Sequence, residues 1–158
     1  MKKNKMIVGM MGAMLFGAMV LPVHAEEMTV TYRQPNAYKI TIPSSVDLSA
    51  GETSNKIEVK DVNLEPGKEI KVKISSGVNA NGVIELSREQ DTNTKAVTTI
   101  STSKGGNGIA LNTDFVSFTT NGEQTLYYSA IEAKDGEQIK AGSYKGQIVF
   151  AVTAPEQN

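Results

Sequence analysis

The clearest pattern in this chain runs through residues 56–75, KIEVKDVNLEPGKEIKVKIS. Apolar side chains alternate with polar ones on both sides of a central Pro66-Gly67 pair, and this period of two is typical of half-buried strands. Proline and glycine are favoured at the two central positions of a type II turn. The stretch therefore predicts a β-hairpin, in which two antiparallel strands are joined by that turn.

A change of parity in the first of these strands predicts a β-bulge. Ile57 and Val59 point to one face, whereas Val62 and Leu64 have the opposite parity. One extra residue in a strand turns every later side chain to the other face. We therefore place the bulge near Lys60-Asp61.

The same alternation predicts further short strands, at residues 28–33, 38–42, 84–86, 97–100, 109–111, 115–119, 124–131 and 144–152. Asn121-Gly122 is the dipeptide most typical of a tight hairpin turn, so the strands on its two sides are predicted to pair. The last strand is apolar on both faces, which indicates a central place in its sheet. Because no stretch has a helical period, we expect one all-β domain, an antiparallel β-sandwich, with a closed barrel as the structural alternative.

The first 25 residues have the three parts of a secretory signal peptide. Lys2, Lys3 and Lys5 form a cationic start, an uncharged apolar run covers residues 6–21, and Val23-His24-Ala25 supplies the cleavage site. The apolar run is shorter than the roughly 20 residues needed to span a bilayer. We expect cleavage after Ala25, a mature β-sandwich domain of residues 26–158 without a membrane span, and a secreted or extracellular location.

The composition of residues 26–158 narrows the chemistry of the mature chain. It contains no cysteine, histidine or tryptophan, since the single histidine is His24. The usual nucleophiles, proton shuttles and soft metal ligands are therefore missing. Its 17 acidic residues outnumber the 13 basic residues that remain, which gives no reason to expect nucleic acid as a partner. We expect no enzymatic activity, no cofactor and no metal.

Several polar groups are candidates for catalytic or calcium-binding sites, but their sequence context indicates surface or turn roles instead. The carboxylates Glu85, Glu89, Asp91 and Asp114 lie in no glycosidase motif. The oxygen-rich segments 91–94 and 112–114 match neither an EF-hand nor a repeat-toxin calcium spacing, and such residues favour turns in any case.

Both ends of the mature chain resemble a known class of protein. Thr29-Val30-Thr31-Tyr32, followed by Tyr38-Lys39-Ile40-Thr41-Ile42-Pro43, resembles the opening of small secreted domains of Gram-positive bacteria. Residues 141–150, AGSYKGQIVF, resemble the closing strand of immunoglobulin-like surface modules of the adhesin type. This resemblance implies an immunoglobulin-like β-sandwich at the cell surface that contacts a protein or glycan. It carries over no catalytic residue.

Five residues are predicted to have structural roles, and two others are candidate contacts. Tyr144 is expected to pack its ring in the core and bond its hydroxyl to the backbone, with Gly142 and Gly146 allowing close approach. Pro66 and Gly67 are the other two residues with a predicted structural role, at the centre of the turn. The adjacent Tyr127 and Tyr128 must point to opposite faces of their strand, so one of them is a candidate ligand contact.

The expected function is that of a secreted, non-enzymatic structural or interaction protein of the cell surface. A small carbohydrate- or glycoprotein-binding module is the alternative. The strand predicted at residues 28–33 leaves a further choice open, because it can pair within its own sandwich or add to a sheet edge of another copy.

Overall fold

The computed structural model describes residues 28–134, 136 and 138–157, so the predicted signal peptide of residues 1–25 lies outside the described residues. The chain divides into two units, residues 1–33 and residues 34–158. In the first unit, residues 28–33 are exposed and form no strand, in contrast to the strand expected there. No helix in the described ranges is long and apolar enough to cross a membrane.

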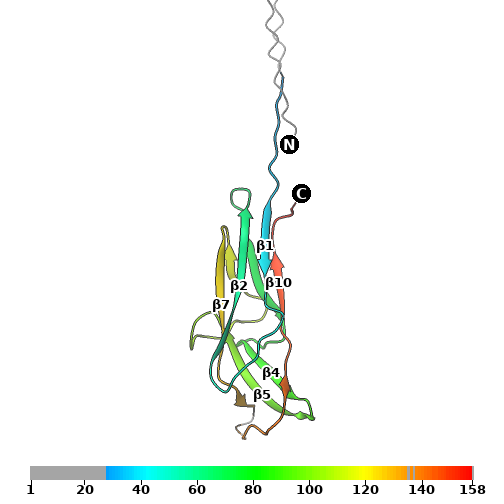
Figure 1. Cartoon of the computed structure of the whole chain (residues 1–158), viewed down its shortest axis with the longest axis vertical. Helices are drawn as coiled ribbons and strands as arrows, with labels where there is room; N and C mark the ends of the chain where they lie inside the picture. The colour runs from blue at the N-terminus through cyan, green and yellow to red at the C-terminus, as the bar shows by residue number, and fades with distance from the viewer. Residues whose placement is uncertain (1–27, 135, 137, 158) are drawn as a thin grey trace, which may run out of the picture. The chain divides into compact units, whose positions relative to one another are not determined.

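All regular structure in the described part of the second unit is β-strand, as the sequence predicts (Figure 1). The strands are β1 (Ala37–Thr41), β2 (Thr53–Asn63), β3 (Ile70–Ser76), β4 (Val83–Arg88), β5 (Asp91–Ser101), β6 (Asp114–Phe118), β7 (Gly122–Tyr128), β8 (Glu132–Ala133), β9 (Tyr144–Lys145) and β10 (Val149–Thr153). The expected strand at residues 109–111 is reduced to an isolated bridge between Ser101 and Gly108.

The strands form two antiparallel sheets. The larger sheet has the order β1-β2-β7-β5-β4-β9, with β8 paired to β5, and the smaller sheet has the order β10-β3-β6. In Figure 1, β2 and β7 lie side by side in the larger sheet. A single apolar core combines buried residues of both sheets, such as Ile57 and Leu126 from the larger and Ile70, Val72 and Ile74 from the smaller.

The hairpin predicted for residues 56–75 is wrong, because its two strands belong to different sheets. β2 pairs with β1 and β7, whereas β3 pairs with β10 and β6. Each of the two strands contributes fully buried side chains from one face, with Ile57 on β2 and Ile74 on β3 both 0% exposed. Two such faces exclude water best when they pack against each other from opposite layers, so the turn at Pro66-Gly67 carries the chain between sheets.

The β-bulge predicted in β2 is confirmed. Ala37 pairs with Asn63 but Lys39 pairs with Lys60, so β2 contains one residue more than β1 over this interval. Asp61 has φ 55°, a left-handed conformation that aspartate adopts more readily than most residues. The bulge explains why the parity of the apolar residues changes here.

The hairpin predicted at Asn121-Gly122 is also wrong. This dipeptide connects β6 of the smaller sheet to β7 of the larger one, so it marks another crossing between layers. The Asn121 side chain, at the start of β7, bonds to the neighbouring strand β2 of the same sheet, where its Oδ1 accepts a hydrogen bond of 2.9 Å from the backbone N–H of Val62. That bond ties the crossing to the bulged end of β2.

The last predicted strand is split, and it is not central. β9 pairs with β4, the chain then leaves that strand, and β10 joins the edge of the smaller sheet beside β3. At the break, a Cβ on Gly146 would lie 2.7 Å from Leu86 Cδ2 and 2.9 Å from the Glu85 carbonyl oxygen, which is closer than real Cβ contacts. The apolar residues on both faces of β10 therefore belong to an edge strand, with Phe150 facing Phe115 and with Val152 partly exposed.

We expect Ile57→Ala to lower the free energy of unfolding by about 2–5 kcal/mol, because it leaves a cavity between the two sheets. The matched change Ile139→Ala, at a side chain that is 40% exposed, should cost less than about 1 kcal/mol. Urea unfolding followed by circular dichroism measures both values. Equal losses for the two variants would contradict a core centred on the packing of β2 against β3.

Candidate functional site

The first hollow of the surface lies at the turn between β2 and β3, and we call it the turn hollow. It has a volume of about 400 Å³ and is lined by residues 64–69 and Thr119. The backbone N–H of Lys68 donates to the Glu65 carbonyl at 3.1 Å, and Gly67 has φ +80°. Pro66 and Gly67 thus occupy the two central positions of a turn in which glycine supplies the positive φ.

Asn36 holds this turn in place from the start of β1. Its Oδ1 accepts a hydrogen bond of 2.8 Å from the Glu65 backbone N–H, and its Nδ2 donates to the Glu156 carbonyl at 3.2 Å. A third contact nearby joins the Gln157 amide to the Tyr38 carbonyl at 2.9 Å. The turn, β1 and the C-terminal tail are therefore linked by side-chain amides.

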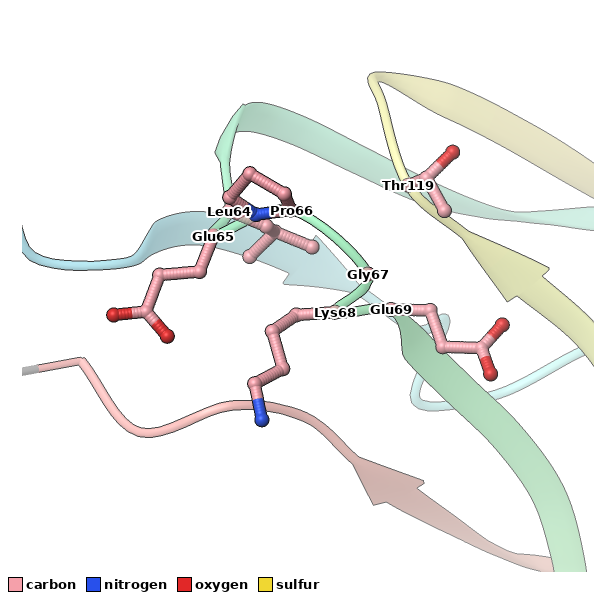
Figure 2. Close-up of a pocket in the computed structure, with 7 residues that line it drawn as sticks. All are labelled: Leu64, Glu65, Pro66, Gly67, Lys68, Glu69 and Thr119. Atoms are coloured by element: carbon pink, nitrogen blue, oxygen red, sulfur yellow. The ribbon is translucent and has the colours of Figure 1, made fainter.

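The charges around the turn hollow do not converge on one point. Figure 2 shows the carboxylates of Glu65 and Glu69 pointing in different directions. The Lys68 ammonium points away from the Glu69 carboxylate. Glu69 bonds to Lys71 at 2.8 Å, and hydrogen bonds from Lys71 and Ser117 lower the pKa of its carboxyl. A paired carboxylate of this kind suits the solvated surface of a sheet better than acid–base chemistry.

The second hollow, which we call the polar hollow, lies between the start of β5 and the chain around β8 and β9. Its volume is about 290 Å³, and most of the side chains around it are polar. They are Asp91, Asn93, Thr94, Lys95, Ala133, Lys134, Gln138, Ile139, Lys140 and Tyr144. Three of these ten residues are lysines, so the polar hollow can offer ammonium donors to an acidic or hydroxyl-rich ligand.

Two of the three lysines are held by a carboxylate on β4. Glu85 pairs with Lys134 and, at 3.3 Å, with Lys95, whose ammonium also donates to Ser87 Oγ at 2.6 Å. Hydrogen bonds from Lys134 and then from Lys95 lower the pKa of the Glu85 carboxyl. The arrangement neutralises part of the positive charge beside the polar hollow.

Asp91 also lines the polar hollow, and its carboxylate stabilises a turn. Its Oδ1 accepts from the Asn93 backbone N–H at 3.1 Å, and its Oδ2 accepts from Thr94 Oγ1 at 2.8 Å. The hydrogen bond from Thr94 is the main cause that lowers the pKa of Asp91, with a smaller contribution from Lys140. The segment 91–94 therefore satisfies its own oxygens, as an Asx turn does.

Tyr144 has its ring partly buried against the core, and its hydroxyl donates to the Lys140 carbonyl at 3.0 Å. The same loop is held by Arg88, whose Nε and Nη2 donate to the Ala141 carbonyl at 3.0 and 2.7 Å. A Cβ on Gly142, which has φ +144°, would lie 2.7 Å from Arg88 Nε. This glycine allows the guanidinium to approach the backbone of the loop.

The two adjacent tyrosines of β7 have different environments. Tyr128 is 2% exposed, its hydroxyl lies 3.4 Å from Asn55 Oδ1, and burial raises its pKa. Tyr127 points to the other face and is partly exposed beside Lys56. Glu123 bonds to Lys56 at 2.6 Å and raises the pKa of its ammonium, and Tyr127 adds a smaller effect in the same direction. Tyr127 is thus the tyrosine of the pair that reaches the surface.

The remaining carboxylates weighed from the sequence lie apart from one another in the strand order. Glu89 pairs with Lys145 at the β4–β9 side of the larger sheet, whereas Asp114 begins β6 in the smaller sheet. Within residues 28–134 and 138–157, no cluster of three or more potential metal-ligating side chains from histidine, cysteine, aspartate and glutamate occurs.

Sequence reasoning missed one surface feature, the exposed edge of β10. The available signal was the uncharged run at residues 148–153, IVFAVT, which we interpreted as a central strand. An edge strand without charged residues is uncommon, because charges on an edge prevent pairing with other chains.

A scan against models of known protein families finds no match, and a search of curated proteins finds none either.

The Glu85 ion pairs predict a small dependence of stability on pH. Because the folded pKa of Glu85 lies below its ordinary value of 4.5, the pairs stabilise the fold above that pH. This contribution is lost as the pH falls through the lower, folded pKa. We expect Glu85→Gln to cost up to about 1 kcal/mol at pH 7, since the pairs are partly exposed, and nothing in strong acid.

Urea unfolding of both proteins between pH 7 and pH 2 measures this difference. Glu65→Gln is the matched control, because the Glu65 carboxylate makes no ion pair in the described part of the chain. A Glu85→Gln effect that stays constant into acid would show that the ion pairs are not its cause.

Proposed function

We propose that this chain is a secreted, non-enzymatic protein of the immunoglobulin-like, adhesin type, which acts at the surface of a Gram-positive bacterium as a structural or interaction module. The support for export is the signal-peptide pattern of residues 1–25. The absence of cysteine and histidine from residues 26–158 supports a role without covalent or proton-transfer chemistry.

The immunoglobulin-like part of the proposal is supported by the two antiparallel sheets and the connections between them. The chain crosses from one sheet to the other between β2 and β3 and again between β6 and β7. Such crossings are typical of Greek-key sandwiches, in which successive strands alternate between layers. The closing segment around Tyr144, whose hydroxyl bonds to the backbone, fits the same resemblance.

The observation that carries the functional proposal is the edge of β10. Its five residues, Val149–Thr153, include no charge, and Val149 and Val152 are 43% and 38% exposed. The four other edge strands in the described part of the chain each contain a charged residue, namely Lys39 in β1, Asp114 in β6, Glu132 in β8 and Lys145 in β9. An uncharged, partly apolar edge offers backbone donors and acceptors to an extended partner.

Fractionation of a Gram-positive host that expresses the full chain tests this function. We expect the protein in the medium or in the surface extract, beginning at Glu26 by mass spectrometry. Ala25→Lys is the control variant, because a long charged side chain does not fit the small-residue cleavage site. Intact protein that begins at Met1 and stays in the cytosol would contradict the proposal.

The second candidate function, a carbohydrate-binding module, is favoured by Tyr127. Its partly exposed ring lies near the Lys56–Glu123 ion pair, so an apolar ring face and charged hydrogen-bonding groups occur together on one sheet face. Sugar rings bind to such a combination through stacking and polar contacts.

A glycan array with the exported protein tests this candidate. We expect Tyr127→Ala to weaken binding by about tenfold, the loss expected for one stacking contact, while Tyr127→Phe keeps most of the affinity. Binding that is equally strong in all three proteins would exclude Tyr127 as the platform. An array without any bound glycan would leave the structural role as the supported function.

A further inference from the structure

Residues 28–33, MTVTYR, have the pattern of a strand but form none in the part of the chain that the structure describes. Met28, Val30 and Tyr32 share one parity and are 81%, 77% and 84% exposed, and threonines lie between them. Valine, tyrosine and threonine are among the residues most favoured in strands. Such a segment gains from pairing in a sheet, because pairing covers its exposed apolar side chains.

Pro35 separates this segment from β1. A proline has no N–H, so a continuous ladder of backbone hydrogen bonds cannot run from residues 28–33 into β1 (Ala37–Thr41). When the segment does pair, it therefore pairs as a strand separate from β1, and its choice of partner is independent of the pairing of β1 with β2.

The edge of β10 has the properties of a matching partner. β3 pairs with β10 on one side only, and Phe150 anchors β10 to the sheet through an edge-to-face contact of 6.3 Å between its ring centroid and that of Phe115. The other backbone edge of β10 has no strand partner among the described residues. Its five residues are close in length to the six of the segment, and neither stretch contains an acidic residue.

We propose that residues 28–33 of one mature copy add as a strand to β10 of a second copy. The proposal rests on the proposed function, because cleavage after Ala25 leaves the segment two residues from a free N-terminus. Backbone hydrogen bonds to the open edge supply affinity, and the apolar row of Met28, Val30 and Tyr32 covers surface near Val152, the exposed valine on the same face of β10 as Phe150.

This contact generates an open chain of copies. Each copy carries one donor segment and one acceptor edge, and these are different surfaces, so the interface is head-to-tail. A head-to-tail contact that does not close into a ring continues into a filament. The partner chemistry is therefore a second copy of this same chain, and assembly depends on protein concentration.

Light scattering and sedimentation of the exported protein over a range of concentrations test the assembly. We expect the mean mass to rise with concentration, and the change Val30→Lys or deletion of residues 26–33 to weaken association by at least about tenfold. Val152→Lys and Val149→Lys should both weaken it, because each places a charge on the acceptor edge, and circular dichroism verifies that each variant is folded. Thr41→Lys, on the edge strand β1 of the larger sheet, is the control that should leave association unchanged.

Cysteine cross-linking identifies the pairing, because the chain has no cysteine of its own. Copies with one cysteine at Thr29, Thr31 or Arg33 are mixed with copies that carry Ala151→Cys. We expect at least one mixed disulfide dimer, and none with Gly51→Cys as donor, since Gly51 lies in an exposed loop outside residues 28–33, where an added Cβ meets no other residue within 4 Å.

Three results would overturn the strand exchange. They are a monomer at every concentration, association reduced by Thr41→Lys but not by the β10 variants, and a disulfide within single copies carrying both cysteines. Each of these is obtained with exported, folded protein, so it leaves the proposed surface function standing. Failure of export itself would instead overturn the proposed function.

Discussion

The fold depends on the packing of β2 against β3 across two layers. These strands are neighbours in sequence, and each has one face that is removed from solvent, as Ile57 and Ile74 illustrate. If both strands lay in the same sheet, their apolar faces would form one surface, and another part of the chain would have to bury it. Opposite layers let each face cover the other, which removes the most apolar area from water without any disulfide.

This arrangement makes the chain cross between the sheets several times, and asparagine side chains hold two of these crossings. Asn36 binds the backbone of the β2–β3 turn, and Asn121 in the β6–β7 crossing binds the bulged end of β2. A crossing segment leaves the ladder of backbone hydrogen bonds, so its N–H groups need other acceptors. Side-chain amides supply them at both places, which explains why residues common in turns occur here without forming hairpins.

Many of the described charged side chains on the surface are paired with one another. Ion pairs such as Lys56–Glu123 and Lys95–Glu85 cover the sheet faces, and the charged groups of the turn hollow point apart. The edge of β10 differs from this pattern because it is uncharged and partly apolar. The proposed surface function and the proposed strand addition therefore both involve this edge. It contains no charged residue, and a charge there would discourage pairing.

The sequence by itself determined the all-β class, the bulge at Asp61 and the opposite orientations of Tyr127 and Tyr128. These are local properties, because side-chain parity along an extended backbone is set by covalent geometry. Which of the two tyrosines entered the core was not local, since it depends on the side of the sheet that the other layer covers.

Only the tertiary structure decided which strands pair. Pro66-Gly67 and Asn121-Gly122 reverse the chain in the same way whether the next strand pairs with the previous one or crosses to the other layer. The choice depends on the apolar area that distant strands bury together, and no turn residue encodes it. For the same reason, an apolar run such as residues 148–153 does not distinguish a central strand from an edge strand, and β10 became an edge because no other strand lies beyond it within the described residues.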